Sequence, residues 1–167
     1  MTSAELELPR PWLPFVVATY VALGILFAAL VVVQYGLVVL SNYYAETVPQ
    51  YGHLQAPLLV VTLGFCLAVE IGVVATAVLV ARVRSGRILE ARSVPGVDVL
   101  IGSVTVAGLL VAVFAVLVRV ADGVPPGAML FIVIGGIALL ALDLLLLVLR
   151  SLLRRAIALR AELDEVV

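Results

Sequence analysis

Four long apolar runs divide the chain, and short polar segments separate them. The runs cover residues 13–40, 57–81, 98–118 and 127–149. Each contains the roughly 20 residues that an α-helix needs to cross a hydrocarbon core of ~30 Å. The pattern therefore predicts an all-α fold, an integral membrane four-helix bundle that forms a single domain over residues 1–167.

Two of the runs contain an acid, which opposes insertion. Residues 57–81 hold Glu70 and fourteen Leu, Ile, Val or Phe, whereas residues 127–149 hold Asp143 and fifteen. Each of these apolar residues favours insertion by about 0.3–0.6 kcal/mol, and one central charge opposes it by about 3 kcal/mol. The apolar residues outweigh the acid in both runs, so all four are predicted to span.

The arginines predict the orientation, because basic residues in short loops favour the cytoplasmic side. A cytoplasmic loop is expected at 82–97 and a cytoplasmic tail at 150–167. Nine of the ten basic residues then share one side: Arg10, Arg82, Arg84, Arg87, Arg92, Arg150, Arg154, Arg155 and Arg160. Only Arg119 lies on the other side. We expect a multi-pass protein of the cell's inner (plasma) membrane with both termini in the cytoplasm.

Composition agrees with a membrane protein and limits the chemistry of a site. Hydrophobic residues make up 65% of the chain and the mean hydropathy is +1.30, whereas apolar residues form about half of soluble domains. The chain has one cysteine, Cys66, and one histidine, His53, and neither has a second ligand nearby in the sequence for a metal. We expect no metal, no cofactor, no enzymatic activity and no direct binding of nucleic acid.

Glu70 precedes Arg82 by twelve residues, roughly 18 Å along a helix, which places it near the bilayer centre. It points about opposite to a stripe of small residues that lets another helix approach closely: Gly64, Ala68 and Gly72. Its helix therefore needs neighbours on both sides. The carboxyl is expected to be uncharged. It either bonds a neighbouring helix and fixes the register, or it serves as a proton or cation site.

The third and fourth runs offer partners for each other. If the third span enters the membrane at Asp98, then Ser103 and Thr105 lie at the depth of Asp143 and are its expected hydrogen-bond partners. Asp98 itself is expected to cap the third helix, since an acid favours a helix N-terminus. Two glycines of the fourth run are expected to form a helix-packing pair: Gly135 and Gly136.

Glu70 and Asp143 occupy related places in their runs. Asp143 precedes Arg150 by seven residues, so Arg150 can partly reach it and Asp143 is expected to be the shallower acid. A shift of 73 residues lays Glu70 on Asp143 and Arg82 on Arg155, as two related hairpins would. The preference of arginine for the cytoplasmic side explains the same match, so both interpretations stay open.

The tail RSLLRRAIALRAELDEVV continues the fourth run as an amphipathic helix. Its apolar side carries Leu152, Leu153, Ala156, Leu159 and Leu163, and its other side carries Arg154, Glu162 and Glu165. We expect the apolar side to contact the inner loop, a second copy of the chain in a homo-oligomer, or a cytoplasmic protein. The arginines beside the membrane either only set the topology or also contact anionic lipids.

Two segments carry a family resemblance: ARVRSGRILEARSVPGVDVLIGS at 81–103 and LRSLLRRAIALRAELDEVV at 149–167. They resemble the small bacterial four-span membrane proteins grouped as domain of unknown function 2975. That family has no established activity, so the resemblance implies a location and a number of spans but no catalytic residues. The resemblance also implies a protein partner, because genes of the family often lie beside genes for small helix-turn-helix regulators. Such a regulator is an expected partner of this chain.

The sequence favours a non-enzymatic regulatory or interaction protein in the lipid bilayer. The alternative is a small proton- or cation-coupled carrier that uses Glu70 and Asp143. A carrier needs a path for water to Glu70, whereas a packed scaffold needs none.

The first prediction concerns topology. Reporter fusions after residues 50, 90, 123 and 167 should report outside, inside, outside and inside, because nine of ten arginines then face the cytoplasm. A cytoplasmic signal from the fusion at 50 or at 123 would contradict the four-span arrangement.

Overall fold

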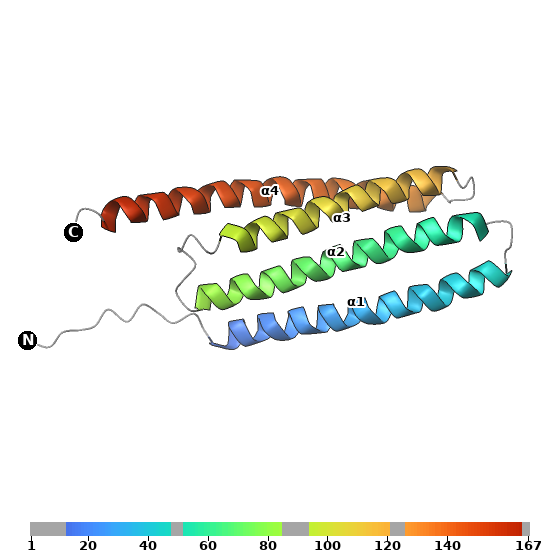
Figure 1. The fold of residues 1–167 in the computed structure, drawn as a ribbon, viewed down its shortest axis with the longest axis horizontal. Helices are drawn as coiled ribbons and strands as arrows, with labels where there is room; N and C mark the ends of the chain where they lie inside the picture. The colour runs from blue at the N-terminus through green and yellow to red at the C-terminus, as the bar shows by residue number, and fades with distance from the viewer. Residues whose placement is uncertain (1–12, 48–51, 85–93, 121–125, 165–167) are drawn as a thin grey trace, which may run out of the picture.

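The computed structural model describes residues 13–47, 52–84, 94–120 and 126–164, and each of these stretches is one α-helix. The helices are α1 (Leu13–Thr47), α2 (Gly52–Arg84), α3 (Val94–Val120) and α4 (Pro126–Asp164) (Figure 1). No strand occurs within the described stretches. The all-α prediction is confirmed.

Each helix contains a segment long and apolar enough to cross a membrane, which confirms the four-span prediction. The segments are Pro14–Tyr43, Gln55–Arg82, Pro95–Val120 and Met129–Ala158. The helices also extend beyond the predicted spans, most clearly in α4, which has 39 residues. This helix carries the predicted amphipathic extension as far as Asp164. The protein is therefore a multi-pass, four-helix membrane protein.

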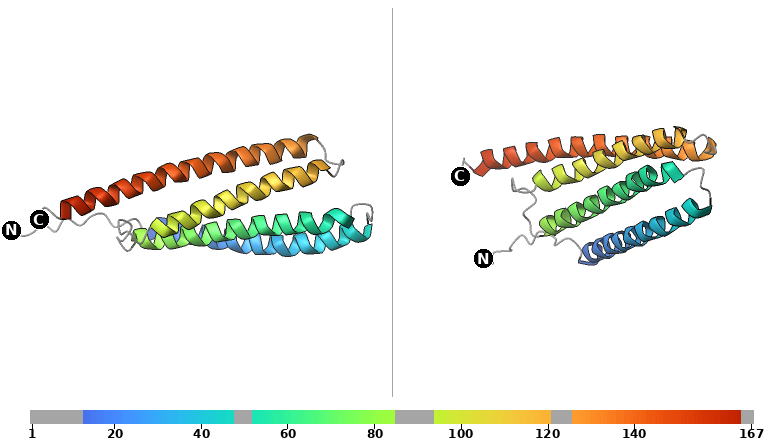
Figure 2. Two further views of the ribbon diagram at one scale, coloured as in Figure 1. Left: turned by 45° about the horizontal axis from the view of Figure 1, so that its top comes forward. Right: turned by 45° about the vertical axis from the view of Figure 1, so that its right-hand side comes forward.

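The helices pack antiparallel and in chain order, so that the bundle is an open row with α1 and α4 at its two edges (Figures 1 and 2). The extensive contacts join α1 to α2, α2 to α3, and α3 to α4. The end of α2 and the start of α3 lie at the same end of the row as the start of α1 and the end of α4 (Figure 1). Helix α2 thus has a neighbour on each side, as its sequence required.

The tightest packing joins α2 and α3 through small side chains. Ala68 and Ala107 are 4% and 2% exposed. A Cβ added to Gly72 would lie 2.9 Å from Ser103 Oγ, and one added to Gly64 would lie 3.4 Å from a methyl group of Leu110. The small-residue stripe of α2 therefore faces α3, where close approach of two backbones gives the dispersion contacts that hold helices together in lipid.

Most large apolar side chains point away from the row. Val32 on α1 is 70% exposed, Leu109 on α3 is 62% exposed and Phe131 on α4 is 78% exposed. None of the most apolar window of α1 is buried inside the protein. A helix that is apolar on every side, with one side on a neighbour and the rest exposed, fits a lipid environment.

The second prediction tests the approach of α2 to α3. Gly72→Ala should lower the melting temperature in detergent, because the new methyl group meets Ser103 Oγ and forces it away from its hydrogen bond to Leu100 O. Adding Ser103→Ala should restore stability by removing that oxygen. Gly102→Ala is the matched control, since its Cβ would meet no atom within 4 Å. A Gly72→Ala protein as stable as the Gly102→Ala control would refute the contact.

Candidate functional site

Glu70 lies in the interface between α1 and α2, near the middle of its span. The side chain is 8% exposed, and Gln34 Nε2 on α1 donates a hydrogen bond of 2.9 Å to Glu70 Oε1. The stripe of small residues lies on the opposite side of α2, against α3. The pattern of the second apolar run predicted the position of Glu70, but its partner Gln34 was not predicted, although Gln34 is the one amide in the first apolar run.

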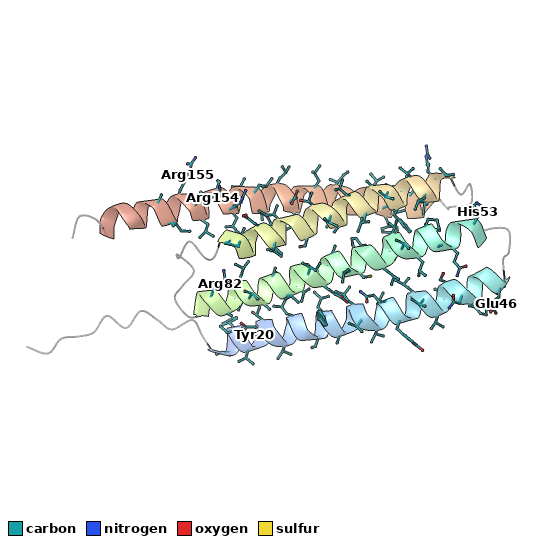
Figure 3. All side chains as sticks on the ribbon, in the orientation of Figure 1. Tyr20, Glu46, His53, Arg82, Arg154 and Arg155 are labelled. Atoms are coloured by element: carbon teal, nitrogen blue, oxygen red, sulfur yellow. The ribbon has the colours of Figure 1, made fainter. Side chains whose placement is uncertain are left out.

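Further polar contacts hold α1 against α2 near the two ends of the helices. Tyr20 donates its hydroxyl hydrogen to Ala77 O at 3.2 Å, and Gln55 Nε2 donates to Ser41 O at 3.1 Å. Figure 3 shows Tyr20 at the end of α1 that lies beside the end of α2. With the contact of Glu70 between them, α1 is attached to α2 at both ends and in the middle.

Asp143 on α4 meets Thr105 on α3, one of its two expected partners. Thr105 Oγ1 lies 3.0 Å from each carboxyl oxygen of Asp143 and also 3.0 Å from Ile101 O of its own helix. A hydroxyl has one hydrogen and therefore donates to one of these acceptors at a time. Ser103, the other expected partner, faces α2 instead.

Arg150 and Asp98 form an ion pair between α4 and α3. Arg150 Nη2 donates to Asp98 Oδ2 at 2.9 Å, and Arg150 Nε lies beside Asp98 Oδ1. These last two atoms are buried and have no hydrogen bond of their own, so their contact is electrostatic. Two expectations are thus corrected. Arg150 reaches Asp98 and not Asp143, and Asp98 is the fifth residue of α3, too far along the helix to cap it.

The two acids of the spans stand at one level, although they lie in different interfaces. Gly72 faces Ser103, so Glu70 is level with the region of Thr105, and Thr105 bonds Asp143. The expectation that Asp143 is shallower than Glu70 is therefore wrong. That expectation compared how far each acid lies along its own helix from the first arginine that follows it. The two distances are not comparable, because Arg150 lies farther from the end of the row than Arg82 does. The acids do not share one site.

The predicted packing glycines differ in their surroundings. Gly64 and Gly72 face α3, and Ala68 between them is buried. Gly136 faces α3 as well, since its Cβ would lie 3.7 Å from Val111 Cγ1. A Cβ on Gly135 would meet no atom within 4 Å, so this glycine does not contribute to contacts among the described helices.

The predicted basic residues gather at one end of the row, where Figure 3 labels Arg82, Arg154 and Arg155. The last two are exposed, whereas Arg150 is engaged with Asp98. Arg84 and Arg160 are described only as parts of helices, and Arg10, Arg87 and Arg92 lie outside the described residues. At the opposite end of the row, Arg119 lies in the last turn of α3.

Within the described helices, no three His, Cys, Asp or Glu side chains lie close enough together to hold a metal ion. Cys66 is buried and its sulfur forms no disulfide. Glu70, Asp143 and Arg150 instead each contact a side chain of a neighbouring helix. The arrangement can fix the register of the helices.

The family comparison covers most of the chain. Residues 39–167 match the model of a family described as protein of unknown function (DUF2975). The chain belongs to this family. The match begins near the end of α1 and continues through α4, and it confirms the resemblance drawn from the two segments. No curated protein and no solved structure matches, so the function of this DUF2975 protein has to be argued from its own residues.

The third prediction tests the bond between Gln34 and Glu70 in the DUF2975 protein. Glu70→Gln keeps an oxygen that accepts from Gln34 and should leave stability near wild type. Glu70→Leu removes the acceptor and should lower the free energy of unfolding by about 0.6–2 kcal/mol, the range for hydrogen bonds between helices in membranes. Thermal unfolding in detergent measures both.

A matched control comes from the donor side. Gln34→Leu combined with Glu70→Leu should recover much of the loss, because replacing both partners leaves no polar group unsatisfied. If Glu70→Gln and Glu70→Leu lose equal stability, the hydrogen bond does not hold α1 in place.

Proposed function

We propose that this chain is a non-enzymatic interaction protein of the inner membrane, which presents the end of α4 to a partner in the cytoplasm. The observation that supports this proposal is a division of the polar side chains. Glu70, Asp143 and Arg150 within the spans contact a neighbouring helix, whereas Arg154 and Arg155 near the end of α4 are exposed. A protein of this kind needs a fixed membrane part and one accessible element.

Helix α4 is longer than a bilayer requires. Its 39 residues correspond to roughly 58 Å at 1.5 Å per residue, and the hydrocarbon core is ~30 Å thick. Arg150 pairs with Asp98, and α3 has four residues before Asp98, so the start of α3 is level with Arg154. Residues 155–164 therefore project beyond α3, as Figure 1 shows. This projection is roughly 15 Å long.

The projecting part has two kinds of surface. Leu152 at its base is 55% exposed, and Arg154 and Arg155 are exposed beside it. The sequence continues its apolar side through Leu159 and Leu163. An amphipathic helix that projects beyond its neighbour suits a groove on a second copy or on a soluble protein. Given the family resemblance, a small helix-turn-helix regulator is the first partner to test.

The fourth prediction tests the end of α4. Truncation after Leu153 should leave insertion and thermal stability intact, because Asp98 still meets Arg150, but it should abolish capture of the partner from native membranes. Substituting Leu159→Glu and Leu163→Glu together should have the same effect. Glu162→Gln, on the opposite side of the helix, is the matched control and should retain the partner. Recovery of the same proteins with and without the tail would refute the proposal.

The carrier alternative predicts a different result with the Glu70 variants. A proton carrier needs a group that loses its proton, so Glu70→Gln would fold normally and abolish proton or cation flux in reconstituted vesicles. The interaction proposal expects no flux in the wild type. Flux in the wild type that disappears in a stable Glu70→Gln protein would overturn the proposal in favour of the carrier.

A further inference from the structure

Three arginines lie at one end of the row, and we call them the arginine belt: Arg82 on α2, and Arg154 and Arg155 on α4 (Figure 3). Arg154 and Arg155 are exposed, and Arg82 is half-buried. In Figure 3, Arg154 extends toward the neighbouring helices and Arg155 extends to the other side of α4. The belt therefore presents guanidinium groups around the row and not into one pocket.

The arginines of the belt stand at one level. Arg82 Nη1 lies 3.8 Å from the position of a Cβ on Gly96, the third residue of α3. Arg150 pairs with Asp98, so Arg154, one turn farther along α4, is level with the first turn of α3. Two helices separated by α3 thus place their arginines in one plane across the row. This plane is where α2 ends and α3 begins.

The described side chains near this plane carry a net positive charge. Asp98 is the acid closest to it, and Arg150 already neutralises Asp98. Two acids near the end of α4, Glu162 and Asp164, come seven and nine residues after Arg155, so they lie roughly 10 Å or more farther along the helix. Among the described side chains, the opposite end of the row carries Glu46 and Arg119, one charge of each sign. The two ends of the protein therefore differ in the headgroups they suit.

We propose that the arginine belt binds the phosphate groups of anionic phospholipids in one leaflet. Guanidinium groups bind phosphate oxygens in pairs, and a plane of them at the ends of spanning helices matches the plane of headgroup phosphates. Arginines that only set topology need no contact with a headgroup, so the two roles are separable by measurement. This inference does not rest on the proposed function of the tail.

The experiment measures lipid binding by the purified full-length protein. Native mass spectrometry counts bound phosphatidylglycerol and phosphatidylcholine, and the melting temperature is recorded as each lipid is added. Phosphatidylglycerol should bind preferentially to the wild type. Arg154→Gln with Arg155→Gln should weaken that preference by about fivefold for each arginine, roughly 30-fold together, which corresponds to ~1 kcal/mol for each basic residue at a membrane surface.

Three controls keep the outcome decisive. Arg119→Gln removes an exposed arginine at the opposite end and should leave the preference unchanged. Arg154→Lys with Arg155→Lys keeps the charges, so it should retain most of the binding and also guards against loss of folding in the glutamine variant. Water-soluble glycerol 3-phosphate at millimolar concentration should not displace the lipid, because the belt recognises phosphates held in a plane.

Each contrary result overturns the proposal. Equal binding of the two lipids by the wild type would show that the belt only sets topology. An unchanged preference in the glutamine double variant, or an equal loss in Arg119→Gln, would place the lipid elsewhere. Displacement by glycerol 3-phosphate would assign the site to a free phosphate and not to the leaflet.

Discussion

Hydrocarbon offers no hydrogen-bond partner, so polar side chains on the spanning helices have to find partners within the protein. Several hydroxyl groups do so locally. Thr19, Thr62 and Thr76 each donate to the carbonyl oxygen four residues earlier in the same helix, which satisfies the hydroxyl without a neighbouring helix. Carboxyl, amide and guanidinium groups have more atoms to satisfy, and those of Glu70, Asp143 and Arg150 reach an adjacent helix. The larger polar groups therefore determine which helices meet and in which register.

Packing of small residues stabilises the contact between helices, and the hydrogen bonds fix the register in which the helices meet. Lipid tails are as apolar as leucine, so burying apolar side chains between two helices gains little, and close approach of backbones matters more. That approach occurs between α2 and α3, where Ala68, Gly72, Ser103 and Ala107 meet. The outer helices α1 and α4 are more exposed and are held at specific polar points. The row thus has a tightly packed central pair and two edges that depend on Glu70 and Asp143.

The sequence predicted the features that depend on a single helix. The four spans follow from length and apolar content, and the opposite directions of Glu70 and the small stripe follow from helical periodicity. The start of α3 was misjudged because Asp98 appeared to be a cap, although Pro95 suits the first turn of a helix and could have marked the earlier start. Contacts between helices were harder to predict. Gln34 and the Asp98–Arg150 pair depend on how far each helix slides along its neighbour, which a single sequence does not record.

The register also bears on whether the two hairpins are related. The shift of 73 residues that lays Glu70 on Asp143 lays Gln34 on Ala107, which is buried between α2 and α3 and cannot donate to an acid. Thr105, which does meet Asp143, corresponds to Val32, which is exposed on α1. The acids match but their partners do not, so each interface has its own solution to the same physical requirement. Since both acids already serve contacts between neighbouring helices, a function in recognition is better sought on exposed surfaces such as the end of α4, where Arg154 and Arg155 are exposed.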